Sequence, residues 1–208
     1  MPLVKILSSW NNLNRCIFFT DLDADKKRLK VEVVAEKLKM LDPEVKVKTY
    51  ADRIENLGEN FIAKFDIVLG CLDNIAARLH LNAHSYYYRV PYVDSGTLGM
   101  LGKVQVVYPP ITSSLECGMN KTHMKVLEKR FSCTGADVTF YEAKLPAEIT
   151  TTSVVAAIQV REALKITNKK EDMIIKNLLY YDGNRNVCEI LEIPINPCLL
   201  YTSPSPRD

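Results

Sequence analysis

The sequence has no apolar run approaching the roughly 20 residues that a membrane-spanning helix requires. Its first residues do not resemble a signal peptide, and the chain contains no internal repeat. The formal net charge is only +2, so neither a basic face for nucleic acid nor an acidic tail stands out. These absences argue against a membrane protein and against a nucleic-acid-binding protein, and we expect a cytoplasmic protein.

The six cysteines lack the regular spacing of a disulfide framework. This pattern favours a reducing compartment, in which an important cysteine is catalytic or metal-bound rather than disulfide-bonded. With 208 residues, 47% of them hydrophobic, the chain is long enough to form one globular domain with a substantial core.

Residues 67–72 (IVLGCL) are a short apolar run, which predicts a buried strand. Asp73 and Asn74 follow at once, and apolar residues then recur at helical spacing as far as the tyrosines at 86–88. α/β proteins place ligands where a strand turns into a helix, because the carboxyl end of the strand and the positive helix N-terminus meet there. Asp73 is therefore the first candidate functional residue. The alternative is that Asp73 only caps the helix.

Apolar periodicity and turn residues predict the other elements. Strands alternate with helices, which indicates an α/β fold with a largely parallel sheet covered on both faces. A hairpin is expected around residues 182–184 (DGN), and the threonines at 150–152 are expected to cap the helix that they begin. The remaining expected elements are helices at 27–41 and 150–166 and strands at 45–50, 91–95, 103–108 and 138–143.

Three glycines, Gly96, Gly99 and Gly102, lie three residues apart between two of the expected strands. They do not form the G-x-G-x-x-G pattern of a phosphate-binding loop, and no helix follows them. We expect them to serve turns or close backbone contacts instead.

Five stretches, taken in order, resemble the motifs of one family. They are NNLNRCIFF at 11–19, RLKVEVVAEKL at 28–38, CLDN at 71–74 together with Ala77, Arg78 and Asn82, VDSGTLGMLGKVQVV at 93–107 and PAEITTTSVVAAIQVREALKI at 146–166. The family is the ubiquitin-activating-type superfamily, which includes ThiF, MoeB and HesA. The resemblance implies a Rossmann-like, ThiF-type α/β fold with a mostly parallel sheet.

The resemblance also implies an activity. Enzymes of this family use ATP and Mg²⁺ to adenylate the C-terminal glycine of a ubiquitin-like or sulfur-carrier β-grasp protein, and they are commonly homo- or heterodimers. By resemblance, Arg15 and Lys30 contact the triphosphate, Asn12 and Asn74 belong to the nucleotide site, and Asp73 lies near Mg²⁺ and the glycine carboxylate. Arginine can bind phosphate through two parallel hydrogen bonds, whereas lysine acts as a point charge.

Cys133 is the candidate nucleophile that the resemblance implies. In activating subunits for ubiquitin-like proteins, a Cys-Thr pair at a similar distance after a Cys-x-x-Cys motif takes the acyl group as a thioester, and FSCT (131–134) fits that position. The alternative is an inert cysteine. The family's Cys-x-x-Cys pairs hold structural zinc, but Ser114 replaces the first ligand of the pair that ends at Cys117, so we predict no metal site.

The chain departs from the family at both ends. The glycine-rich nucleotide loop and the strand that follows it should precede Asn12 and are absent from the sequence, so we expect the first βαβ unit to be missing. Residues 198–208 (CLLYTSPSPRD) resemble the translation of a transposase adapter used in sequencing libraries. We therefore expect residues 1–197 to be a partial ThiF-type adenylation domain and residues 198–208 not to be native.

Two rival functions remain open from the sequence. A MoeB- or ThiF-like adenylyltransferase would serve a sulfur-carrier protein without forming a thioester. A non-catalytic partner subunit would bind the modifier or a second subunit without using ATP. A dinucleotide oxidoreductase fits less well, because no stretch resembles a hydride-transfer site.

Overall fold

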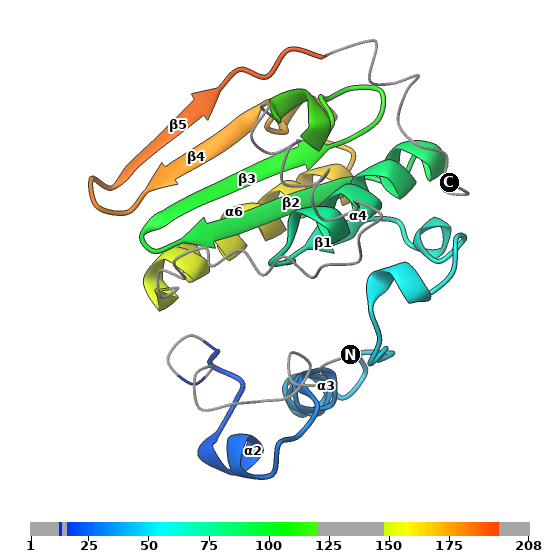
Figure 1. Cartoon of the computed structure of the whole chain (residues 1–208), viewed down its shortest axis with the longest axis vertical. Coiled ribbons are helices and arrows are strands. Elements are labelled where there is room, and N and C mark those ends of the chain that lie inside the picture. Colours follow the sequence, from blue (N-terminus) through cyan, green and yellow to red (C-terminus); the bar gives the residue numbers. More distant parts are fainter. Residues whose placement is uncertain (1–12, 14–15, 120–147, 196–208) are drawn as a thin grey trace, which may run out of the picture. The chain divides into compact units, whose positions relative to one another are not determined.

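The computed structural model describes residue 13 and residues 16–119 and 148–195. The chain forms two compact units, Met1–Leu57 and Gly58–Asp208 (Figure 1). The expected helix at 27–41 belongs to the first unit, and all of the described strands belong to the second. The strand expected at 138–143 lies outside the described residues.

The first unit contains the helices α2 (Asp21–Asp25) and α3 (Lys30–Leu41) and the 3-10 turn η2 (Ile54–Asn56). A capping box begins α2: the Thr20 side chain accepts from the Asp23 amide, and the Asp23 carboxylate accepts from the Thr20 amide at 3.0 Å. Arg28 Nη1 donates to Oδ1 of the same Asp23 at 3.0 Å, and Arg28 Nη2 donates to Glu36 of α3 at 2.6 Å. These polar contacts fix the connection between the two helices.

Two predictions for this unit need correction. The helix expected at 27–41 begins three residues late, because Lys27 has a left-handed backbone with φ of 48° and interrupts the helical path. Residues 45–50 alternate like a strand but form no strand, because a strand requires a hydrogen-bonded neighbour and no described segment pairs with them.

The second unit is built on a five-stranded sheet in the order β1-β2-β3-β4-β5 (Figure 1). Its helical elements are η3 (Ile62–Lys64), α4 (Ile75–Tyr88), η4 (Leu115–Gly118), α6 (Ile149–Thr167) and η5 (Glu171–Met173). Its strands are β1 (Val68–Gly70), β2 (Tyr92–Leu98), β3 (Leu101–Val107), β4 (Leu178–Asp182) and β5 (Val187–Leu191).

The α/β class is confirmed, but the sheet of the described residues is mixed, where a mostly parallel sheet was expected. β1 pairs with β2 in parallel, and the other three pairs are antiparallel. The reason is connection length: β2 and β3 are joined at once through Gly99, whose φ is 58°, and such a tight turn can join only antiparallel strands. The predicted hairpin at 182–184 likewise joins β4 and β5.

The helices α4 and α6 cover opposite faces of the sheet. Neighbouring residues of a strand point to opposite faces. On β2, Val93 belongs to a core cluster with Val155 of α6, whereas Asp94 forms an ion pair with Arg78 of α4. The cluster on the α6 side is completed by Val104, Val106, Ile166, Ile174 and Leu179.

The helix α6 begins one residue before the expected start, and its threonines do not cap it. Glu148 occupies the cap position without a side-chain capping bond, and Thr151 lies inside the helix, where its hydroxyl donates to Glu148 Oε2 at 3.0 Å. Nineteen residues long, α6 is still not apolar enough to cross a membrane, and the same holds for the other helices in the part of the chain that is described.

Candidate functional site

Asp73 is an exposed residue in the loop between β1 and α4, just beyond the carboxyl end of the strand. The helix cap is the next residue: Asn74 has an extended backbone, and its Oδ1 accepts from the Ala77 amide at 2.8 Å. The alternative that Asp73 caps the helix is therefore wrong. Its carboxylate sits where the strand end and the positive N-terminus of α4 converge.

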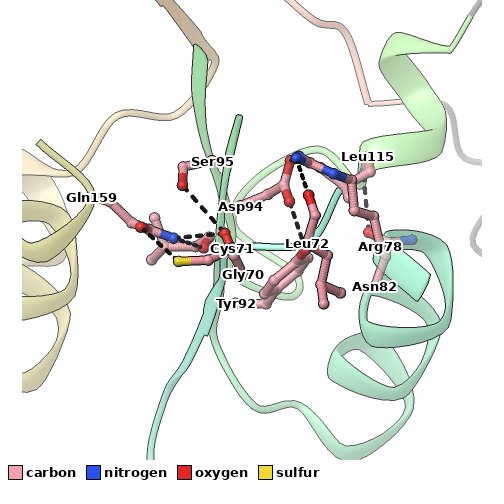
Figure 2. Close-up of polar contacts among 11 residues, drawn as sticks. Gly70, Cys71, Leu72, Arg78, Asn82, Tyr92, Asp94, Ser95, Leu115 and Gln159 are labelled. Carbon is pink, nitrogen blue, oxygen red and sulfur yellow. Dashed lines mark hydrogen bonds and ion pairs between the residues drawn. The ribbon is translucent and has the colours of Figure 1, made fainter. Parts of the chain in front are cut away.

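Arg78, one turn into α4, ties this loop to the sheet (Figure 2). Its Nη1 donates to Oδ2 of Asp94 on β2 at 2.7 Å, and its Nη2 donates to the carbonyl oxygen of Leu72. The Asp94 side chain is only 1% exposed, and that of Arg78 is 15% exposed. One guanidinium thus holds both a buried carboxylate and the peptide group immediately before Asp73.

Tyr92 completes the surroundings of Asp94. The Tyr92 hydroxyl donates to Asp94 Oδ1 at 2.7 Å, so each carboxylate oxygen has its own donor. Burial, reinforced by the negative charge of Asp94, raises the pKa of Tyr92 well above its usual range, which keeps the hydroxyl protonated as a donor. This pair of donors stabilises a buried charge that would otherwise be unfavourable.

Gln159 of α6 approaches the same strand end from the opposite face (Figure 2). Its Nε2 donates to the carbonyl oxygens of Gly70 at 3.0 Å and of Val93 at 2.8 Å. The Ser95 hydroxyl also donates to the Gly70 carbonyl, at 3.2 Å. Gln159 therefore bridges β1 and β2 at the point where β1 ends.

Cys71 was expected to be buried in the strand, but it lies just beyond β1 and is exposed. Its thiol donates to Oε1 of Gln159 at 3.6 Å. The atoms packed around the thiol still desolvate it enough to raise the pKa of Cys71, so that little thiolate forms at neutral pH. This environment makes Cys71 a poor nucleophile.

Lys103 brings a second cation to the Asp94 side of the sheet, since it pairs in register with Gly96 of β2. Desolvation lowers the pKa of Lys103, the charge of Asp94 partly offsets this, and the positive charge of Arg78 lowers it further. The two cations therefore lie close enough to influence each other.

The C-terminal half of α4 anchors the segment that follows β3. Asn82 Oδ1 accepts from the Leu115 amide at 2.9 Å, and the Tyr86 hydroxyl donates to the Thr112 carbonyl at 2.7 Å. Asn82 and Tyr86 follow Arg78 at intervals of four, so all three project from one face of the helix. This face fixes α4 against both the sheet and residues 112–115.

The predicted site residues are only partly placed. Asp73 and Asn74 are together in the second unit, and Lys30 is the first residue of α3 in the first unit. Asn12, Arg15 and Cys133 lie outside the described residues, so their assigned roles stay predictions. In residues 16–119 and 148–195, no three histidine, cysteine or acidic side chains come together to hold a metal ion. At the expected zinc-ligand position, Ser114 Oγ lies 3.5 Å from Cys117 Sγ.

The sequence motifs alone indicate no role for Arg78, Asp94 or Gln159, although all three residues lie in the motifs that resemble the family. The sequence does indicate that Asp94 and Gln159 need polar partners. An aspartate inside the apolar strand at 91–95 must find a cation or donors if the strand is buried, and a glutamine on the inner face of an apolar helix must find partners of its own. Which partners they find depends on the tertiary fold.

The parallel β1–β2 pair, the β1–α4 turn and the helices on both faces define a Rossmann-like α/β protein. A sequence model of the ThiF family matches residues 8–198. The chain belongs to the ThiF family.

Curated relatives agree with this family. The chain is 36% identical over 109 residues to ubiquitin-like modifier-activating enzyme 1 of Dictyostelium discoideum and, over the same length, to that of Homo sapiens. It is 33% identical over 111 residues to ubiquitin-activating enzyme E1 1 of Schizosaccharomyces pombe. The matches to the first two cover 50% of this chain and 10% of each relative, so the matched segment spans about a tenth of their length.

Solved structures show the same fold. Escherichia coli MccB with ATP superposes with a TM-score of 0.69 at 19% identity, covering 91% of this chain and 55% of MccB. MccB with AMPCPP and selenomethionine MccA gives the same TM-score and identity, with 92% and 55% covered. At this identity the likeness concerns the fold alone.

Proposed function

We propose that this chain belongs to an enzyme that activates a ubiquitin-like protein by adenylating its C-terminal glycine. The observation that carries the proposal is the position of Asp73: an exposed carboxylate at the carboxyl end of β1 that does not cap the helix, on a loop held by Arg78 and Gln159. Membership of the ThiF family and the similarity to modifier-activating enzymes support the choice of reaction.

The proposed reaction converts a poor acyl donor into a good one. A terminal carboxylate oxygen attacks the α-phosphorus of ATP, the bond from that phosphorus to the pyrophosphate oxygen breaks, and an acyl-adenylate forms. AMP is then a far better leaving group than oxide. The attack builds negative charge on phosphate oxygens, so cationic side chains are required around the nucleotide.

Asp73 has the chemistry that a magnesium ion requires. Mg²⁺ prefers oxygen ligands and is commonly held by one or two carboxylates together with substrate phosphates, and Asp73 offers an exposed carboxylate at the strand end. When bound, the ion neutralises charge on the phosphate oxygens. In this proposal Asp73 holds the ion and lies beside the incoming glycine carboxylate, and Asn74 contributes from the adjacent turn.

Lys30, Arg15 and Asn12 are proposed to bind the nucleotide. Lys30 supports this, because it is the first residue of α3, and a cation at a helix N-terminus is electrostatically unfavourable unless an anion offsets it. A hydrogen bond to a charged group is worth about 1.5–3 kcal/mol, which is roughly one to two decades in binding or rate. Lys30→Ala is therefore expected to weaken ATP binding by about that factor.

We further propose that Cys133 accepts the acyl group as a thioester. Its thiolate attacks the acyl carbon of the adenylate, the bond to AMP breaks, and AMP leaves. A free cysteine with a pKa near 8.5 is only about 3% thiolate at pH 7, so basic neighbours at positions 129 and 130 in the sequence would favour the reactive form.

ATP–pyrophosphate exchange with a panel of ubiquitin-like and sulfur-carrier proteins tests the adenylation step. The 208-residue chain is assayed as it stands and fused behind a glycine-rich βαβ unit from a ThiF relative. We expect exchange with at least one partner and its loss in Asp73→Ala. Near-normal exchange in Asp73→Ala would contradict the role of this residue, and absence of exchange with every partner would favour a non-catalytic subunit.

A non-reducing gel run beside the exchange assay tests the thioester. We expect a thiol-sensitive adduct that disappears in Cys133→Ala and persists in Cys188→Ala, since Cys188 is an exposed thiol on β5 and provides a matched control. Exchange without any adduct would instead indicate an adenylyltransferase that serves a sulfur-carrier protein.

A further inference from the structure

The backbone at the end of β1 is held from both faces of the sheet (Figure 2). From the α4 side, Arg78 donates to the Leu72 carbonyl. From the α6 side, Gln159 donates to the Gly70 carbonyl at 3.0 Å, with a further bond from Ser95 at 3.2 Å. We call this arrangement, formed by Arg78 and Gln159 on the carbonyls of Leu72 and Gly70, the backbone clamp.

The Arg78 side chain does more than attach α4 to the sheet. Its ion pair with Asp94 already connects α4 with β2, because Asp94 is buried and receives a second donor from Tyr92. The other guanidinium nitrogen reaches Leu72, one residue before Asp73. The rigid planar fork of a guanidinium holds a carboxylate and a separate carbonyl in fixed directions, whereas a lysine ammonium is a compact charge on a flexible stem.

Gln159, like Arg78, donates hydrogen bonds to two separate groups. A glutamine amide can donate two hydrogen bonds, and here both go to backbone carbonyls, one on β1 and one on β2. Gln159 is 2% exposed, so its polar groups are satisfied by the protein. An apolar residue of similar volume would fill the space equally well and would leave both carbonyls without this donor.

Two glycines make room for the clamp. A Cβ on Gly96 would lie 2.7 Å from Nη2 of Arg78, and a Cβ on Gly70 would lie 2.4 Å from the ring of Tyr92, the residue that supports Asp94. Such distances are shorter than any normal contact, so larger residues at these positions would displace the side chains that hold the loop.

We infer that Arg78 and Gln159 are positioning residues that fix the Leu72–Asp73 and Gly70–Cys71 peptide groups, respectively, and so hold the Asp73 carboxylate in one place. The consequence for catalysis rests on the proposed function of Asp73. The clamp itself is a property of the fold and can be tested without any substrate.

Hydrogen–deuterium exchange of the full chain tests the clamp directly. In Arg78→Lys and in Gln159→Met we expect the peptide that covers residues 70–77 to exchange at least tenfold faster, while a peptide covering residues 102–107 of β3 keeps its wild-type rate. Arg161→Lys, an exposed residue of α6, is the matched control and should change neither peptide. Unchanged exchange at residues 70–77 in both clamp variants would overturn the inference.

Steady-state kinetics of ATP–pyrophosphate exchange then separates positioning from general stability. We expect Arg78→Lys and Gln159→Met to lower kcat by tenfold or more and to keep the KM for ATP within twofold, because neither residue is assigned to the nucleotide. If deuterium exchange at residues 70–77 is faster but kcat stays within twofold of wild type, the positioning role is overturned. A wild-type protein without exchange would contradict the proposed function, and deuterium exchange would still decide whether the clamp exists.

Discussion

The Tyr92 hydroxyl donates a 2.7 Å hydrogen bond to Oδ1 of Asp94, two residues along the same strand. Tyr92→Phe keeps the ring and leaves this buried oxygen without its donor, so we expect the free energy of unfolding to fall by about 1–3 kcal/mol. Urea denaturation measures the change. Tyr87→Phe, at a residue that is 55% exposed, is the control and should lie within about 0.5 kcal/mol of wild type. Equal stabilities of Tyr92→Phe and wild type would show that the bond contributes nothing.

Single substitutions in the buried ion pair between Arg78 and Asp94 should each cost more stability than expected from the cost of removing both charges together. Asp94→Leu leaves the Arg78 charge, 15% exposed, without its carboxylate, and we expect a loss of about 3–5 kcal/mol. Arg78→Met with Asp94→Leu removes both charges and should lose less than the sum of the two single variants. A double-mutant cycle from urea denaturation gives the coupling, and simple additivity would contradict a direct interaction.

The cap of α4 predicts a stability effect at Asn74. Asn74→Ala removes the side-chain oxygen that accepts from the Ala77 amide, and about 1 kcal/mol of stability should be lost. Asn74→Ser keeps a capping oxygen and should remain within a few tenths of a kcal/mol of wild type. Thermal denaturation followed by circular dichroism distinguishes them; equal losses in both variants would argue against capping.

The contact between Gly70 and Tyr92 predicts that even one methyl group is too large at residue 70. A Cβ there would lie 2.4 Å from the Tyr92 ring, so Gly70→Ala should destabilise the protein by about 1–3 kcal/mol. In a Tyr92→Leu background the ring is gone, and the same substitution should have a much smaller effect. An identical penalty in both backgrounds would place the cause in the backbone of β1 rather than in the ring.

The raised pKa of Tyr86 predicts a loss of stability at alkaline pH. Burial, with the nearby acidic groups of Cys117 and Glu116, raises the pKa of Tyr86 from 10.0 to about 12. The folded state therefore favours the protonated phenol, and this contribution is complete below pH 10 and disappears as the pH rises toward 12. Since the ring is partly exposed, we expect the stability advantage over Tyr86→Phe to shrink by about 1 kcal/mol across that interval. Urea denaturation at pH 9 and pH 11.5 measures it, and a constant difference would contradict the shift.

Local patterns predicted the elements that depend on local signals. The apolar repeat after Asn74 gave the helix α4 within its observed bounds, and the turn residues 182–184 gave the β4–β5 hairpin. The alternating residues 45–50 carry an equally good strand pattern and form no strand, because pairing depends on a neighbour that the pattern itself does not supply. Propensity describes a segment, whereas a sheet is a relation between segments.

The candidate site was predictable only in part for the same reason. Asp73 could be proposed from its place after a strand, since the end of a parallel strand is a common ligand position. Its support could not: Arg78 lies sixteen residues from Asp94, and Gln159 lies eighty-nine residues from Gly70. A sequence shows that a buried aspartate or glutamine needs partners, but the fold decides which ones it receives.

The order of the strands in the sheet has a consequence for how the protein is made. Among the described strands, each lies beside the one that precedes it in the sequence, and the connection from β3 to β4 is the longest. During translation every new strand therefore meets an edge that has already emerged from the ribosome, and most pairings close over short distances. The five described strands can therefore pair one at a time, in the order in which they leave the ribosome.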